Sequence, residues 1–279
     1  MRLPGATVLL TGATGGLGHA VALALHERGA RLIITGRRAE VLEPLAARIG
    51  ARALACDLSD PREVDRLVDE VGRVDVLVAN AGVPAGGHIA QHSVDDIDAA
   101  LAVNLRAPIV LARRLSEAMV ERGGGHIVFM SSLAGKAASP GGALYSATKF
   151  GLRGFALGLR EDLAPHGVGV SAVYPGFISG AGMFADSGAR LPRYVGTRPP
   201  QDVAVAVVDA IERDRAEIDV APFNLRAGAL LAGVAPALSA RVQRRFGAAA
   251  MSAAISDGQA RARRASAGSV PREDADRGI

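Results

Sequence analysis

The chain has 279 residues, of which 49% are hydrophobic and 22% charged, and its formal net charge is +4 at pH 7. This composition is typical of a soluble globular protein with one large domain, and the small charge excess gives no reason to expect nucleic-acid binding. No apolar run approaches the roughly 20 residues of a membrane-spanning helix, and the N-terminus has no signal-type segment. The single cysteine, Cys56, excludes an internal disulfide framework and fits a reducing compartment, so the sequence predicts a cytoplasmic protein.

Short apolar runs alternate with helical patterns along the first 221 residues. Several of these runs are apolar at consecutive positions, which is typical of parallel strands covered on both faces. Strands are expected at 6–11, 31–35, 52–56, 75–79, 126–130, 169–173 and 217–221, and helices at 18–28, 39–49, 61–71, 94–121, 144–164 and 201–213. The alternation predicts an α/β fold over residues 1–222, a doubly wound parallel sheet (Rossmann fold) of about seven strands with helices on both faces.

Three segments lie outside this pattern. Residues 176–200 are rich in Gly and Pro and predict a long substrate loop, since long loops in compact domains are usually functional or disordered. Residues 223–251 are expected to form a helical extension, and 252–279 a flexible tail with little apolar periodicity. The loop carries the apolar side chains of a lid over an apolar substrate: Met183, Phe184, Leu191 and Tyr194.

Within the extension, residues 226–246 join an apolar half to a half that carries Arg241, Arg244 and Arg245. Such a segment could make peripheral contact with an anionic membrane surface. It could equally form helices packed over the substrate cleft or against another subunit. Gly233 and Pro236 interrupt the apolar half, which favours packing.

The stretch TGATGGLG, residues 11–18, follows the first strand and opens the first helix. Backbone N–H groups at such a helix N-terminus favour a pyrophosphate, and the glycines let it approach. The glycines fit two spacings of the motif, Gly12-Gly16-Gly18 and Gly12-Gly15-Gly18. The alternative to a phosphate site is a tight turn that binds nothing.

At the end of the second strand, Gly36 offers no carboxylate to an adenosine ribose, whereas Arg37 and Arg38 offer positive charge. Positive charge at this point favours NADP(H), because its 2′-phosphate replaces the ribose hydroxyl that NAD(H) presents. NAD(H) stays open, since surface arginines are ordinary in a chain whose only lysines are Lys136 and Lys149.

Tyr145 and Lys149 are four residues apart on a predicted helix and therefore share a face. Lowering a phenol pKa from about 10 by about three units takes roughly 4 kcal/mol. One ammonium about 4 Å away, at an effective dielectric of about 20, supplies an interaction of that order. Ser132 follows the strand at 126–130, where its hydroxyl could donate to a substrate carbonyl beside Tyr145. The pattern indicates acid–base chemistry at the carboxyl edge of the sheet.

Over about residues 5 to 221, the chain resembles the compact branch of the short-chain dehydrogenase/reductase superfamily in the order and spacing of its motifs. These motifs are TGATGGLG, CDL, NAG, Asn104 in LAVNL, Ser132, YSATK and PGFIS. The resemblance implies the glycine register 12-16-18 and four catalytic residues. Tyr145 would exchange the proton, Lys149 would bind the nicotinamide ribose and lower the tyrosine pKa, Ser132 would polarise the carbonyl, and Asn104 would hold a water. The candidate cofactor-binding residues are Gly12, Thr14, Gly15, Gly16, Leu17, Gly18, Arg37, Arg38, Asp57, Leu58, Asn80, Ala81, Gly82, Tyr145, Lys149, Pro175, Gly176, Phe177 and Ile178.

The chain departs from the family pattern at three points. Gly15 stands where NADP-dependent members often carry a basic side chain, Ser179 stands where threonine is usual, and the chain continues past the usual end. His88 and His92 have no acidic or cysteine cluster beside them, so no metal is expected.

The predicted function is an NADP(H)-dependent oxidoreductase that transfers hydride between nicotinamide and a carbonyl or secondary alcohol. One alternative is an epimerase or dehydratase of the same superfamily, which the 12-15-18 register leaves open, although NAG and the Ser132 position count against it. Another is a non-catalytic dinucleotide-binding regulator, which would have no use for a proton relay. The expected partners are a small-molecule substrate and further copies of the chain, as a homodimer or homotetramer.

Overall fold

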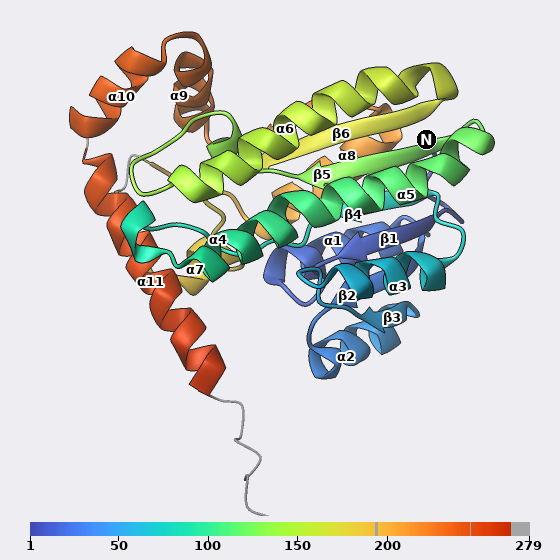
Figure 1. The fold of residues 1–279 in the computed structure, drawn as a ribbon. Helices are drawn as coiled ribbons and strands as arrows, with labels where there is room; N and C mark the ends of the chain where they lie inside the picture. The colour runs from blue at the N-terminus through green and yellow to red at the C-terminus, as the bar shows by residue number, and fades with distance from the viewer. Residues whose placement is uncertain (193–194, 246, 269–279) are drawn as a thin grey trace, which may run out of the picture.

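The computed structural model describes residues 1–192, 195–245 and 247–268. Seven strands form one parallel sheet in the order β3-β2-β1-β4-β5-β6-β7 (Figure 1). They are β1 Thr7–Thr11, β2 Arg31–Gly36, β3 Arg52–Ala55, β4 Val76–Ala79, β5 Gly125–Met130, β6 Val168–Pro175 and β7 Glu217–Val220. Every pairing between neighbours is parallel, which confirms the predicted doubly wound α/β fold.

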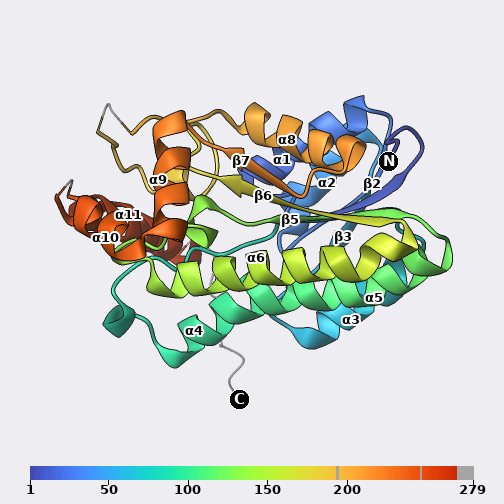
Figure 2. The same cartoon turned by 90° about the horizontal axis from the view of Figure 1, so that it is seen from above.

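Helices cover both faces of the sheet (Figure 2). One layer holds α1 Gly16–Glu27, α2 Ala39–Ile49 and α8 Pro200–Arg213, and the other holds α3 Pro61–Val71, α5 Ala107–Glu121 and α6 Ala143–Leu163. Along β1, Val8 and Leu10 pack into the first layer and Leu9 into the second, as the period of two in a strand requires. Burial on both faces explains why the strands are continuous apolar runs in the sequence.

The segment 94–121, expected as one helix, contains an irregular turn. α4 Val94–Leu101 begins at a capping box formed by Ser93 and Asp96. A π-helical turn, η2 Ala102–Arg106, then leads into α5, and Ala107 N–H donates to the carbonyl of Ala102 five residues back. Pro108 has no N–H to donate to Asn104 four residues earlier, which favours this wider turn. The irregular turn places Asn104 in the protein interior.

The chain after the sheet is helical for longer than expected. It forms α9 Phe223–Val234, α10 Pro236–Arg245 and α11 Ala248–Gly268, so the predicted flexible tail from residue 252 is helix as far as Gly268. Alanine-rich sequence favours helix, and α11 packs on the short helix α7 Met183–Asp186 through small residues rather than an apolar stripe. Residues 269–279 of that tail lie outside the described part. None of the described helices is both long enough and apolar enough to span a bilayer.

Candidate active site

The loop between β1 and α1 requires glycine at three positions. Gly12 has φ +69°, and a Cβ there would lie 2.7 Å from the Cα of Ala81. A Cβ at Gly18 would overlap the carbonyl oxygen of Gly12, and one at Gly16 would overlap Ala181. A Cβ at Gly15 would meet only the Gly12 oxygen at an ordinary 3.5 Å. The sterically required glycines are therefore those of the 12-16-18 register.

α1 begins at this loop with no side chain capping its first turn. The orphan N–H groups of a helix N-terminus attract anions, and the absent Cβ atoms leave the backbone open to one. The loop is thus a cradle of the kind that a pyrophosphate fills.

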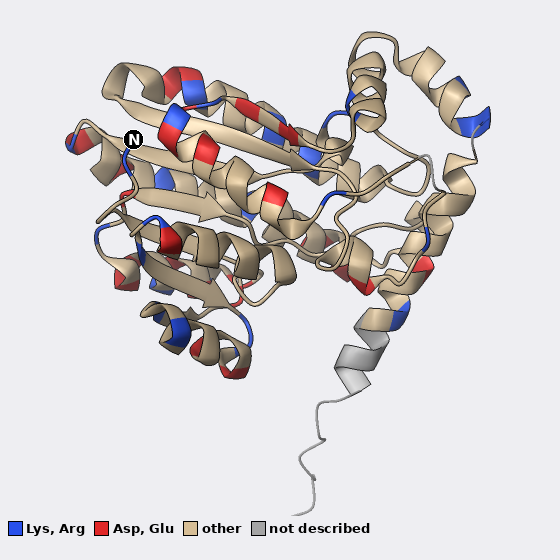
Figure 3. Ribbon diagram, turned by 180° about the vertical axis from the view of Figure 1, so that it is seen from behind, with Lys and Arg blue, Asp and Glu red and all other residues tan. Residues whose placement is uncertain are grey.

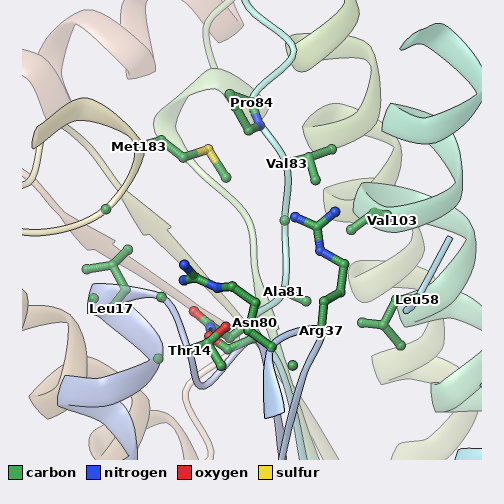
Figure 4. Close-up of a pocket in the computed structure, with 18 of the residues that line it drawn as sticks. Thr14, Leu17, Arg37, Leu58, Asn80, Ala81, Val83, Pro84, Val103 and Met183 are labelled. Carbon is green, nitrogen blue, oxygen red and sulfur yellow. Dashed lines mark hydrogen bonds between the residues drawn. The ribbon is translucent and has the colours of Figure 1, made fainter. Parts of the chain in front are cut away.

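A cleft of about 610 Å³ extends from this cradle across the carboxyl ends of the strands (Figure 4). Every candidate cofactor-binding residue from Gly12 to Gly82 lines it. Its size is in the range of small-molecule and cofactor sites. Further wall residues, which the sequence did not predict for the cofactor, are Thr35, Gly36, Cys56, Val83, Pro84, Val103, Gly182, Met183, Asp186, Gln259 and Ala262.

The end of the cleft beside β2 and β3 carries Arg37 and Asp57. Burial alone would raise the pKa of Asp57, but hydrogen bonds from the Ser59 amide and hydroxyl, together with the charge of Arg37, hold it below its usual range. Gly36 lies against Thr14, where an added Cβ would be 2.8 Å from Thr14 Cγ2. This end of the cleft presents arginine and no carboxylate at the end of β2.

At the other end, Gly82 connects the cleft to the predicted catalytic residues. A Cβ on Gly82 would lie 3.2 Å from Asn104 Oδ1, 3.3 Å from Met183 Cε and 3.8 Å from Lys149 Nζ. Asn104 is fixed by Val83, whose N–H donates to Oδ1 at 2.8 Å and whose carbonyl accepts from Nδ2 at 2.9 Å. The structure therefore brings Asn104 and Lys149 to the edge of the cleft.

Tyr145 stands in the first turn of α6, with its phenol near the Ser132 hydroxyl. Ser132 follows β5, accepts from the Ala134 N–H at 3.2 Å and donates to the Pro175 carbonyl at 3.3 Å. Burial raises the pKa of Tyr145 to about 12, against a smaller opposing effect of the Ser132 hydroxyl. The phenol is thus protonated at neutral pH.

Lys149 is buried one helical turn further along α6, and its Nζ donates to the Met130 carbonyl at 2.9 Å. Burial lowers the pKa of Lys149 to about 8. Nζ lies 5.7 Å from the centroid of the Tyr145 ring. The expected lowering of the tyrosine pKa by this ammonium is not seen, because desolvation dominates at both groups and Nζ bonds to a backbone carbonyl.

Comparison with known proteins identifies the family of the chain. Residues 6–191 match the family model described as short chain dehydrogenase. The chain belongs to the short-chain dehydrogenase/reductase family. The chain is an oxidoreductase of this family that acts on CH–OH or C=O groups.

Individual relatives of the enzyme include a ketoacyl reductase, HetN of Nostoc sp., which is 37% identical over 78% of this chain and 79% of its own. A short-chain dehydrogenase from Sphingobium yanoikuyae in complex with NADPH superposes with a TM-score of 0.71 at 25% identity, over 98% of this chain and 99% of that one. The 3-ketoacyl-(acyl-carrier-protein) reductase of Brucella melitensis complexed with NADH gives 0.70 at 26% identity, over 78% and 97%. Family members with similar folds thus bind either nicotinamide dinucleotide.

The segment 175–178 of the enzyme lies at the end of β6, beside Ser132 rather than in the cleft wall. Two backbone hydrogen bonds hold the loop of residues 176–200 together: Arg198 N–H donates to the Phe177 carbonyl at 3.0 Å and Ser179 N–H to the Arg198 carbonyl at 2.9 Å. The Phe177 ring packs on Phe184, with centroids 5.2 Å apart. Of the predicted lid residues, Met183 lines the cleft, whereas Tyr194 lies outside the described residues.

The C-terminal helix of the enzyme contributes two wall residues that the sequence did not indicate. Gln259 and Ala262 of α11 line the cleft, and Gln259 Nε2 donates to the Met183 carbonyl at 3.3 Å. No local signal could have found them, since they fall in the segment expected to be flexible.

His88 caps a short 3₁₀ turn, η1 Ile89–Gln91, and the described residues contain no group of three or more side chains placed to bind a metal.

Proposed function

We propose that the enzyme is an NADP(H)-dependent oxidoreductase that interconverts a carbonyl compound and a secondary alcohol, with Tyr145 as acid and base. The observation that carries the proposal is the position of Gly82, where the glycine-lined cleft meets Asn104 and Lys149. The sterically required 12-16-18 register and the nearness of Ser132 to Tyr145 support this reading over an epimerase or dehydratase.

The cleft fits a nicotinamide dinucleotide, because the uncapped N-terminus of α1 opens onto it and Gly12, Gly16 and Gly18 line it without side chains. Arg37 and Arg38 would hold a 2′-phosphate, which is the basis for preferring NADP(H). Asp57 and Leu58 would contact the adenine. A bound dinucleotide supplies or accepts the hydride.

Tyr145 and Ser132 would together receive the substrate oxygen. With a pKa of about 12 the phenol holds its proton at neutral pH, as an acid must before it donates to a carbonyl oxygen during reduction. Lys149, with a pKa of about 8, is mostly charged at neutral pH, and its ammonium would bind the ribose hydroxyls of the nicotinamide nucleotide. Asn104 would keep the Val83 backbone in place beside them.

The substrate class is proposed from the loop and from the relatives. Met183, Phe177 and Phe184 give the neighbourhood of the site an apolar character. Two of the relatives above are named as ketoacyl reductases, so 3-oxoacyl thioesters belong in the first screen beside simple ketones.

The test combines turnover and cofactor binding. Tyr145→Phe should lower the rate of carbonyl reduction roughly 100- to 10,000-fold while NADPH affinity, measured by fluorescence titration, stays near that of the parent. Arg37→Ser should weaken NADPH roughly 10- to 100-fold and leave NADH nearly unchanged, with Arg31→Ser as the matched control. Binding of NADPH without turnover of any carbonyl or alcohol would instead support the regulator alternative. Absence of dinucleotide binding would refute the proposal.

A further inference from the structure

The helical hairpin of α9 and α10 exposes a group of large apolar side chains. On α9, Phe223, Leu230 and Val234 are 83%, 72% and 80% exposed. On α10, Leu238 and Val242 are also exposed. Single exposed apolar residues are ordinary, but a cluster on one element indicates an interaction surface.

These side chains lie on one side of each helix. Residues seven and four apart share a helical face, as 223, 230 and 234 do on α9, and as 238 and 242 do on α10. Ala229 of α9 and Ser239 of α10 are buried, so each helix also packs against the protein. Gly233 and Pro236 do not interrupt the apolar face, because they fall where α9 ends and α10 begins.

Positive charge surrounds this apolar face. Arg226, Arg241, Arg244 and Arg245 are all exposed, and none is paired with a carboxylate of the described residues. The sequence from residue 220 to 256 contains no Asp or Glu. Arg244 and Arg245 lie in the last turn of α10, and Figure 3 shows blue and no red at that end of the hairpin.

We propose that the α9–α10 hairpin binds an anionic membrane surface, with its apolar side chains among the lipid chains and its arginines on the headgroups. Apolar side chains beside unpaired cations are the composition of helices that lie in the plane of such an interface. The proposal is independent of the proposed reaction. The sequence favoured packing over the substrate cleft or against another subunit, and we propose instead the peripheral membrane contact that it left open.

Charge also argues against a second copy of the chain as the occupant of this face. In a two-fold interface the same patch meets itself, so the arginines of both copies would come together without carboxylates between them. An anionic bilayer supplies both the apolar phase and the opposite charge. The hairpin is also fixed to the body, since Gln243 Nε2 donates to the Ala138 carbonyl at 3.1 Å.

The experiment measures sedimentation of the full-length protein with vesicles of phosphatidylcholine, alone or mixed with phosphatidylglycerol. Binding is expected on the mixed vesicles and should weaken with added salt. One variant combines Phe223→Ser, Leu230→Ser and Val234→Ser, and a second combines Arg241→Gln, Arg244→Gln and Arg245→Gln. Each basic residue near an anionic surface adds roughly a five-fold factor in binding, so the second variant should bind roughly 100-fold more weakly.

Matched controls change the same residue types elsewhere on the surface. Val94→Ser with Val205→Ser removes exposed apolar side chains of α4 and α8, and Arg31→Gln with Arg48→Gln and Arg62→Gln removes exposed arginines. The controls should sediment like the parent protein, and circular dichroism should be unchanged for all variants.

Three results would overturn the proposal. The first is equal sedimentation with neutral and mixed vesicles. The second is a loss in the controls as large as in the hairpin variants. The third is a fall in the molecular mass of the free protein when Phe223, Leu230 and Val234 are replaced, because a second copy would then be the occupant.

Discussion

The glycine register makes a prediction about two residues three positions apart. Gly18→Ala and Gly15→Ala add the same methyl group to the same loop. At Gly18 the new Cβ would overlap the Gly12 oxygen and lie 2.8 Å from the Cα of Ala13, where ordinary contact begins at 3.4 Å. At Gly15 it would meet the Gly12 oxygen at 3.5 Å, on an extended backbone with φ −85° and ψ 155° that alanine adopts freely.

The backbone around Gly18 must therefore move by at least about 0.5 Å, and the atoms it meets are not free to yield. Gly12 is held in a left-handed conformation against the Ala81 backbone. Overpacking of this kind costs about 1–3 kcal/mol or more, and the gain of alanine over glycine within a helix, about 1 kcal/mol, offsets only part. We expect Gly18→Ala to lose about 2 kcal/mol and Gly15→Ala to stay within about 1 kcal/mol of the parent.

Thermal unfolding and NADPH titration measure both consequences. A loss of about 2 kcal/mol lowers the Tm of a protein of this size by roughly 4–8 °C, and displacement of the cradle should weaken NADPH at least tenfold. Gly15→Ala should match the parent in both assays. Equal effects of the two substitutions, or a Gly18→Ala protein that binds NADPH normally, would refute the steric assignment of the register.

Two further predictions follow from buried titratable groups. Lys149→Met should abolish turnover yet raise the free energy of unfolding by about 2 kcal/mol at pH 7. The substitution removes a desolvation cost of about 3 kcal/mol and loses one hydrogen bond to the Met130 carbonyl. Urea unfolding at pH 7 measures the change, and a variant less stable than the parent would contradict the prediction. Burial lowers the pKa of His126 to about 4 from an ordinary 6.5, so between these values the unfolded chain binds more protons and stability falls as pH falls. His126→Gln should remove up to about 3 kcal/mol of this acid sensitivity in urea titrations at pH 7 and pH 4.5, and an unchanged pH dependence would show that another group is responsible.

Local sequence patterns were sufficient to predict the strands of the sheet but not the full extent of the C-terminal helices. Strands such as β4 are buried on both faces, so they have apolar residues at consecutive positions and can be recognised in the sequence. α11 has no such stripe, because it is held by close backbone approach, and a Cβ at Gly258 would overlap the Ser187 carbonyl. Contact through small residues produces no apolar periodicity in the sequence, which is why residues 252–279 were predicted to be a flexible tail.

The candidate site divides in the same way. Gly12 to Gly18, Arg37 and Asn80 stand at strand ends, where chain order alone brings them to one edge of a parallel sheet. Gln259 reaches the cleft only through the packing of α11 on α7, which depends on tertiary structure. The spacing of Tyr145 and Lys149 gave their shared face correctly, but their pKa values depend on desolvation by the folded chain, which spacing does not contain.

This desolvation predicts how cofactor binding should depend on pH. Below its pKa of about 8 Lys149 is charged, and above it the buried side chain becomes neutral, whereas Tyr145 keeps its proton up to about pH 12. If the ammonium binds the cofactor, kcat/KM for NADPH, which reports the free enzyme, should be level below pH 8 and fall up to tenfold per pH unit above it. Arginine stays charged to a much higher pH, so kcat/KM for NADPH of any active Lys149→Arg enzyme should not decrease above pH 8. A fall near pH 8 that persists in Lys149→Arg would assign the titration to another group and would remove the charge of Lys149 from the mechanism.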